Sequence, residues 1–182
     1  MRFHFNDRKT AQAAAYLLQL HGGSMEYMKL IKLLYLADRG VLLAVGQPIT
    51  GDRLVSMKHG PVLSRVLDFI THGPERTQSE WFSYVAEPEG YSVALKREPE
   101  LDELSKYEMR VLKHMHEQFG ALDKWDLVAL LHKMLPEWQD PGSSMSEIRP
   151  EAILRAESRS EEEIERVGNE AAEMWFLSSV SS

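Results

Sequence analysis

Cysteine is absent from this 182-residue sequence, and that absence excludes a disulfide framework, a thiolate metal site and a cysteine nucleophile. A long hydrophobic run is also missing, because the longest apolar stretch, residues 33–45, is interrupted by Asp38 and Arg39. The first residues contain no apolar segment of the kind that secretory signals carry. We therefore expect a cytoplasmic protein with no membrane partner.

Excess positive charge is lacking as well. The formal net charge is −7, and the Lys and Arg residues are scattered along the chain instead of gathering into a stripe. This charge opposes the phosphate backbone, so direct binding of nucleic acid is not expected. The seven histidines include no i, i+4 pair of metal ligands, and no phosphate-binding or nucleophile-elbow motif is present. We predict no metal site and no cofactor.

What is present fits one folded domain over residues 1–182. Apolar residues make up 43% and charged residues 27%, as in ordinary soluble globular proteins. The spacing of apolar residues predicts a mainly α fold, a compact helical bundle with a small antiparallel β-hairpin or short sheet. Residues 25–45, with Ser24 as their cap, are apolar on most sides and are expected to form a second helix buried in the middle of the bundle.

The other elements follow from capping residues and apolar spacing. The expected caps are Asn6 or Asp7, Ser105 with Glu108, Asp123, and Ser160 with Glu163, and the last helix places Ile164, Val167, Ala171 and Met174 on one side. The third helix is expected to start at Gly60-Pro61, because proline is favoured at the first helical position. Residues 140–146, around Ser143, are the most loop-like stretch. Further helices are expected at 7–20, 105–119, 125–134, 150–157 and 160–177, an extended run at 53–57, and a hairpin at 81–96.

Asp38 is the most informative single residue, because it shares an otherwise apolar helix face with Ile31 and Tyr35. A buried carboxylate needs partners, so we expect Asp38 to be held by Arg53 or by backbone N–H groups near a helix start. The favoured interpretation is a polar brace between the second helix and the 51–61 loop. The alternative is a general acid or base, although no second catalytic group is placed beside it.

The segment Lys58-His59-Gly60-Pro61 offers a cation, an imidazole and a helix start, which are the ingredients of a small anion site. Because proline has no N–H, a loop-stabilising role that includes binding Asp38 or Asp52 is favoured instead. Four aromatic residues are interpreted as core anchors rather than as a binding cage: Tyr35, Trp81, Trp125 and Trp138.

Three motifs follow one another along the chain: Lys32-Leu-Leu-Tyr-Leu-Ala-Asp38, then Gly46-Gln-Pro-Ile-Thr-Gly-Asp52, then Met57-Lys-His-Gly-Pro-Val62 followed by Ser64. With the later stretches 95–105 and 132–138, they resemble the Panacea domain, also called the SocA-like antitoxin domain. The resemblance is strongest over residues 10–138, with helices at 150–178 expected to dock on this region. Its motif residues with a structural role are Tyr35, Asp38, Gly51, Asp52, Gly60 and Pro61.

The resemblance implies an antitoxin of a type II toxin–antitoxin pair, which neutralises a cognate protein toxin by direct binding and not by catalysis. An alternative is an adaptor that delivers the toxin to a cytosolic protease. A third reading is an enzyme with Asp38 and His59 as the reactive pair, and a fourth is a phage-derived accessory protein without a toxin. Many relatives carry a DNA-binding module for which this chain has no room, and homo-oligomer formation is left open.

The partner-binding surface is predicted at the 51–61 loop together with the exposed edge of the 81–96 hairpin. Interfaces of this kind are anchored by a few aromatic, arginine or methionine residues. Five residues are predicted to contact the partner: Arg53, Lys58, His59, Trp81 and Tyr84.

Overall fold

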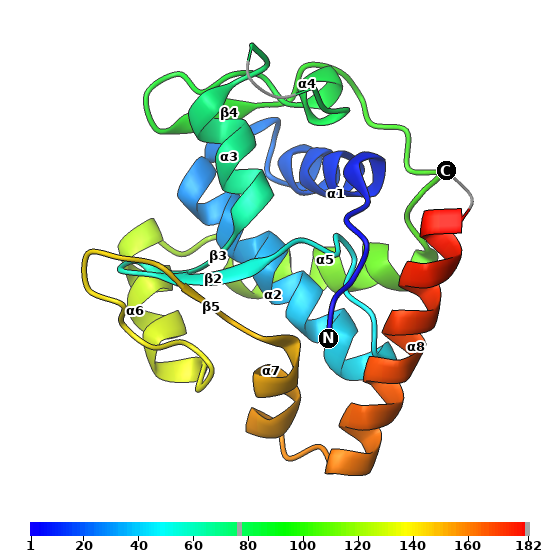
Figure 1. The fold of residues 1–182 in the computed structure, drawn as a ribbon. Helices are drawn as coiled ribbons and strands as arrows, with labels where there is room; N and C mark the ends of the chain where they lie inside the picture. The colour runs from blue at the N-terminus through cyan, green and yellow to red at the C-terminus, as the bar shows by residue number, and fades with distance from the viewer. Residues whose placement is uncertain (76–77, 181–182) are drawn as a thin grey trace.

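The computed structural model describes residues 1–75 and 78–180, which form eight helices and five short strands (Figure 1). The helices are α1 (Asp7–Leu20), α2 (Tyr27–Val45), α3 (Ser64–His72), α4 (Trp81–Tyr84), α5 (Lys106–Phe119), α6 (Lys124–Met134), α7 (Pro150–Ala156) and α8 (Glu161–Val180). The strands are β1 (Ser24–Glu26), β2 (Leu54–Met57), β3 (Gly60–Leu63), β4 (Ser92–Ala94) and β5 (Ser146–Glu147). None of the helices in these ranges has the length and hydrophobicity that a membrane-spanning segment requires.

Helix α2 runs through the centre of the molecule, which confirms the predicted helical bundle around a buried second helix (Figure 1). It packs against α1, α5 and β3, and most of its residues from Leu30 to Leu42 are buried. It ends at Gly46, whose φ of 78° closes the helix in the left-handed region. The predicted cap at Ser24 is wrong, because Ser24 pairs with Ala94 in a strand and α2 begins only at Tyr27.

Strands β2 and β3 form a hairpin, so the predicted start of the third helix at Gly60-Pro61 is wrong. Val55 faces Val62 across the hairpin, and both side chains are buried. Pro61 is tolerated because β3 lies at the edge of the β3-β2-β5 sheet, where the missing N–H breaks no ladder. The helix therefore begins three residues later, at Ser64.

The predicted hairpin at 81–96 is also wrong in its first half. Residues Trp81–Tyr84 form a single helical turn, and β4 pairs with β1. The rest of the predicted hairpin is present, because Val85 bridges Leu95 and Glu89 bridges Ser92 in antiparallel fashion. The Ser79 hydroxyl accepts a hydrogen bond from the Trp81 N–H at 3.0 Å and starts this turn. Trp81 and Tyr84 are each 1% exposed, because a helical turn points both side chains into the core. They are not available at a surface edge, where the prediction had placed them.

The predicted capping residues are confirmed at four helices. The Asn6 side chain accepts from the Lys9 N–H, and the Asp123 side chain accepts from the Trp125 N–H. Ser105 forms the predicted capping box with Glu108. Ser160 and Glu163 exchange the same pair of hydrogen bonds at the start of α8. Helix α8 buries Ile164, Val167 and Ala171 as expected, whereas Met174 is 54% exposed and does not share the docked side.

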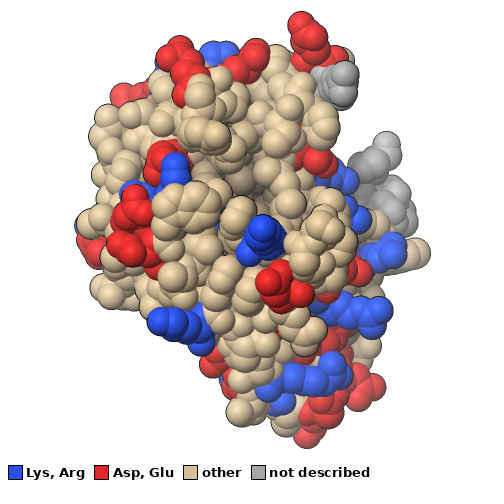
Figure 2. Space-filling model, turned by 90° about the vertical axis from the view of Figure 1, so that its left-hand side faces the viewer, with Lys and Arg blue, Asp and Glu red and all other residues tan. Residues whose placement is uncertain are grey.

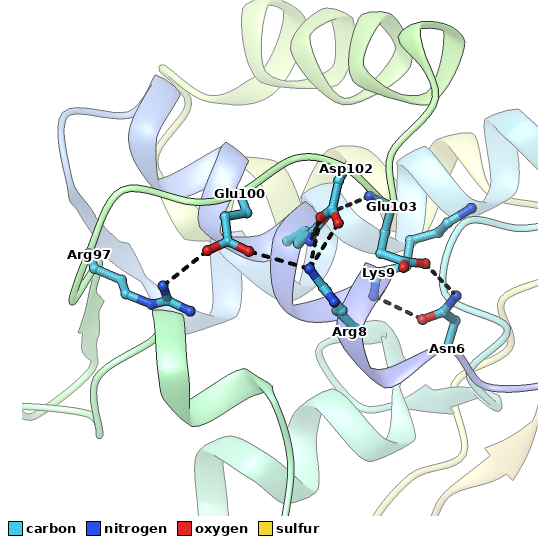
Figure 3. Close-up of polar contacts among 8 residues, drawn as sticks. Asn6, Arg8, Lys9, Arg97, Glu100, Asp102 and Glu103 are labelled. Atoms are coloured by element: carbon cyan, nitrogen blue, oxygen red, sulfur yellow. Dashed lines mark hydrogen bonds and ion pairs between the residues drawn. The ribbon is translucent and has the colours of Figure 1, made fainter.

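A polar clamp fastens the 97–103 segment to α1 (Figure 3). Arg8 Nη2 donates to both carboxylate oxygens of Asp102, at 3.1 and 2.9 Å, and to Glu100 at 3.3 Å. Arg97 pairs with the same Glu100 at 3.5 Å. The buried Gln12 amide donates to Asp102 at 2.6 Å and lowers the pKa of that carboxyl. Because the ion pairs are exposed, the clamp mainly fixes the path of the segment.

Candidate functional site

One face of α2 carries a row of polar side chains that hold other segments of the chain. Lys32, Tyr35 and Arg39 follow one another at i, i+3 and i+7, so they share this face. Lys32 Nζ donates to the Pro61 carbonyl at 2.7 Å. The Tyr35 hydroxyl and Arg39 Nε both donate to Glu137 Oε1, at 2.9 and 2.8 Å. The motif on α2 therefore fixes the β2–β3 hairpin and the segment after α6.

The Lys32 ammonium is enclosed where α2 meets the hairpin. Lys32 is 1% exposed, and this burial lowers the pKa of its amine to about 7. A Cβ added at Gly60 would lie 3.1 Å from Lys32 Nζ, and Gly60 has a φ of 92°. Glycine is therefore required there both by the backbone conformation and by the close approach of the amine.

A second contact holds the opposite side of the hairpin turn. Trp138 Nε1 donates to the Met57 carbonyl at 3.0 Å, and the Trp138 ring stacks on His132 with 3.7 Å between ring centroids. Burial lowers the pKa of His132, and among the described residues its Nε2 has no hydrogen-bond partner. Trp138 is thus a partly buried packing residue, in keeping with its predicted role as an anchor.

Asp38 forms the predicted brace, but its partner differs from the predicted ones. It is 1% exposed and accepts hydrogen bonds from the Thr50 N–H at 3.0 Å and from the Thr50 hydroxyl. Burial raises the pKa of Asp38 to about 7 against the opposing effect of these hydrogen bonds. Arg53 takes no part, because its guanidinium donates to the Ser64 hydroxyl at 3.0 Å. Thr50, a small hydroxyl residue two positions before Asp52, is the sequence feature that could have indicated this partner.

Asp52 acts as a cap for α3 from outside the helix. Its carboxylate accepts from the Arg65 N–H at 3.1 and 3.0 Å and from the Val66 N–H at 3.1 Å. This arrangement is needed because Leu63, at the N-cap position, has no side-chain acceptor. Burial raises the pKa of Asp52, and these N–H groups oppose that rise. The predicted binding of Asp38 or Asp52 by the Lys58–Pro61 segment is therefore wrong.

Gly51 is required because the N-terminal segment lies directly against it. A Cβ at Gly51 would collide with the His4 carbonyl, and the backbone there has a φ of 67°. The Asn6 N–H donates to the Thr50 carbonyl at 2.9 Å beside this contact. The second motif therefore joins the N-terminal segment to α2 and β2.

The β2–β3 turn that Lys32 and Trp138 hold borders an aromatic cleft. We call it the aromatic cleft throughout; its volume is about 360 Å³. It lies where the β2–β3 turn, the start of α6, the start of α2 and the turn before β4 meet. Its lining residues are Glu26, Tyr27, Met28, His59, Tyr91, Lys124 and Trp125. Tyr91 is 69% exposed and Trp125 is 51% exposed, so the predicted role of Trp125 as a core anchor is wrong.

The rings of the cleft are arranged around one ammonium group. His59 meets the Trp125 ring edge-on, with 5.2 Å between ring centroids. Lys124 Nζ lies 5.1 Å from the Tyr91 ring centroid and 5.9 Å from that of Trp125. Lys124 also forms an ion pair with Glu26, and this hydrogen bond raises the pKa of Lys124. The cleft therefore offers flat aromatic faces to a partner, and its lysine, Lys124, is already paired with Glu26.

Figure 2 shows the left-hand side of the view in Figure 1, where α6 and the β2–β3 turn lie. Acidic and basic side chains are interspersed over this side among uncharged residues, and neither sign dominates it. A surface of this kind suits contact with a protein better than contact with a uniformly charged polymer.

The five predicted partner-binding residues do not form one surface. His59 lies in the aromatic cleft, and Lys58 is exposed beside it in the hairpin turn. Arg53 is exposed at the other end of β2, while Trp81 and Tyr84 are buried. The sequence did not lead us to place Tyr91, Lys124 or Trp125 on this surface. The signal for Trp125 was its position outside the buried α6 stripe of Leu127, Val128 and Leu131.

The geometry gives no support to a reactive pair of Asp38 and His59. Asp38 is enclosed and bound to Thr50, whereas His59 lies against Trp125. Within residues 1–75 and 78–180, no three His, Asp or Glu side chains gather closely enough to hold a metal ion.

Comparison with protein families matches residues 30–139 to the family described as "Antitoxin SocA-like, Panacea domain". The match contains all three motifs and most of the aromatic cleft. Its end agrees with the predicted residue 138, whereas residues 10–29 lie before it. No significant match is found among curated proteins or solved structures. Since the matched segment covers more than half of the 182 residues, the chain belongs to the SocA-like antitoxin family that is defined by the Panacea domain.

Proposed function

We propose that this chain is the antitoxin of a type II toxin–antitoxin pair and neutralises a cognate protein toxin by direct binding in the cytoplasm. The observation that carries the proposal is the aromatic cleft. One side of it is the β2–β3 turn, which Lys32 and Trp138 hold. Because the family is one of antitoxins, we expect the partner to be a protein toxin. The cleft supplies a surface that fits such a partner.

The exposed rings of the aromatic cleft are the residues that most often dominate binding energy. Tryptophan and tyrosine are enriched among such residues because they bury much area and lose little rotamer entropy. A stable complex buries about 800 Å² on each partner, so the interface would extend beyond the cleft. We place Lys58 and His59 of the predicted set inside it, together with Tyr91 and Trp125.

The supporting residues explain how the surface is kept in shape before binding. Lys32 and Trp138 hold both sides of the β2–β3 turn, which carries His59. A preorganised surface binds more tightly, because less conformational freedom is lost on association. Mutations in these supports should therefore weaken binding without touching the partner.

The test is co-expression with the product of the neighbouring gene, first for growth and then for co-purification. We expect the neighbour to arrest growth alone, and the wild-type chain to restore growth and to co-purify with it. The variant Trp125→Ala should lose at least tenfold in affinity, as expected for a central aromatic anchor. It should still fold, because the core residues of α6 stay in place.

Tyr107→Ala is the matched control, because Tyr107 is 38% exposed on α5 and lies outside the aromatic cleft. Equal loss of binding in both variants would refute the placement of the interface. A harmless neighbour, or one that does not bind, would refute the antitoxin proposal. A toxin that binds but disappears rapidly only when the antitoxin is present would point to the adaptor and its protease.

A further inference from the structure

A second cleft, away from the aromatic cleft, is lined by three arginines that form no ion pair with a described carboxylate. Ion pairs hold six of the eleven described arginines, at positions 8, 39, 97, 155, 159 and 166. Among the described residues, no ion pair involves Arg2, Arg53 or Arg65, and all three are exposed. Their convergence on one cleft is unexpected in a chain whose net charge is −7.

This arginine cleft has a volume of about 410 Å³. Arg2 comes from the N-terminal segment, Arg53 precedes β2, and Arg65 lies in the first turn of α3. The Arg53 guanidinium donates to the Ser64 hydroxyl at 3.0 Å. The Arg65 guanidinium lies 4.6 Å from the centroid of the Phe5 ring. Neutral groups therefore hold two of these guanidinium groups in position, although the Arg65 charge also acts on the nearby Asp52 carboxylate.

Two carboxylates also line the arginine cleft, and they act differently. Asp52 is 8% exposed, and its oxygens are occupied by backbone N–H groups of Arg53, Arg65 and Val66. The negative charge of Asp52 is therefore largely stabilised by the N–H groups at the start of α3. Glu147 in β5 is exposed, and it would repel an anion in the cleft. Three arginines still outnumber these two carboxylates in the lining, to which Met1 also belongs; the Met1 ammonium is paired with Glu151.

We propose that the arginine cleft binds a compact phosphate-rich anion, of the diphosphate or triphosphate class, either free or carried by a small molecule. Guanidinium groups donate two parallel hydrogen bonds to phosphate oxygens, which favours this ligand geometrically. An open cleft of this volume can admit a small multivalent anion. A nucleic-acid strand or an extended acidic peptide would need a basic stripe longer than the three arginines of this cleft.

The test is isothermal titration of the full chain with inorganic tripolyphosphate at low ionic strength, with no divalent cations. We expect saturable binding that weakens at least tenfold in Arg53→Gln and in Arg65→Gln. Arg110→Gln is the matched control, because Arg110 is not ion-paired in the described structure and lies over Tyr107, outside the arginine cleft. Glu147→Gln should strengthen binding severalfold, a direction that general loss of structure would not produce.

Three outcomes would overturn this proposal. Wild-type protein that shows no saturable binding at millimolar tripolyphosphate excludes the site. Equal weakening by Arg110→Gln means that the anion responds only to overall charge. A tetraglutamate peptide that binds as tightly as tripolyphosphate would assign the cleft to carboxylates instead. None of these results depends on whether the chain neutralises a toxin.

Discussion

Replacing Lys32 by methionine tests the role of the buried amine that holds the β2–β3 hairpin. Methionine keeps most of the length of the side chain but cannot donate to the Pro61 carbonyl, which Lys32 reaches at 2.7 Å. In the folded protein burial lowers the pKa of Lys32 to about 7, whereas its ordinary value is 10.5. Above pH 7 the unfolded chain therefore binds more protons at this residue than the folded chain does.

The sign and size of the effect follow from this difference. A lysine with a depressed pKa gives stability that is fully present above its unfolded pKa and is lost as pH falls through its folded pKa. The free energy of unfolding should rise by about 2 kcal/mol between pH 7 and pH 9 in the wild type through Lys32 alone. Lys32→Met should lack this part of the rise.

Urea denaturation followed by tryptophan fluorescence, at several pH values in this interval, measures both proteins. The difference between the two pH slopes isolates Lys32, because other groups titrate in both chains. A side-chain NMR titration of Lys32 gives a second readout that does not require the variant. Parallel slopes in the two proteins, or an NMR titration near the ordinary lysine pKa, would refute the account of a buried amine.

Three further expectations concern the other supports. Asp38→Asn should remove a pH dependence: the raised pKa of Asp38, about 7, makes the wild type lose stability as pH rises from about 4 to 7, and denaturation curves of the variant should show a smaller loss. Gly51→Ala should lower the free energy of unfolding by about 2 to 3 kcal/mol, because a Cβ there collides with backbone, whereas Gly142→Ala, with a positive φ in open space, should cost about 1 kcal/mol; equal losses would contradict the contact. Glu137→Gln should cost about 2 kcal/mol in urea denaturation, because it breaks the buried pair with Arg39 and leaves that guanidinium with the more exposed Glu157 as its remaining carboxylate partner; a loss below 1 kcal/mol would contradict this.

Much of the helical framework was predictable because its signals are local. A capping box such as Ser105 with Glu108 satisfies backbone groups within four residues, so it is readable from sequence alone. The buried character of α2 was predictable for the same reason, since its apolar residues surround the helix. Asp38 was correctly expected to brace α2, because a carboxylate on an apolar face must find a partner.

The errors occurred where long-range pairing decides the structure. Gly60-Pro61 carries a good helix-start signal, but pairing with β2 makes it a strand. Residues Trp81–Tyr84 alternate like a strand, whereas packing of Trp81 and Tyr84 into the core winds them into a turn of helix. The aromatic cleft could not be predicted, because Tyr91 and Trp125 meet only after four separate segments have come together.

The most direct test of the central claim is affinity capture of the neighbouring gene's product by wild-type protein and by Trp125→Ala, with Tyr107→Ala as control. We expect wild type and Tyr107→Ala to capture the neighbour and to relieve its toxicity equally. Trp125→Ala should fold normally and fail in both assays. Full capture and full relief of toxicity by folded Trp125→Ala would contradict the assignment of the aromatic cleft as the toxin-binding surface.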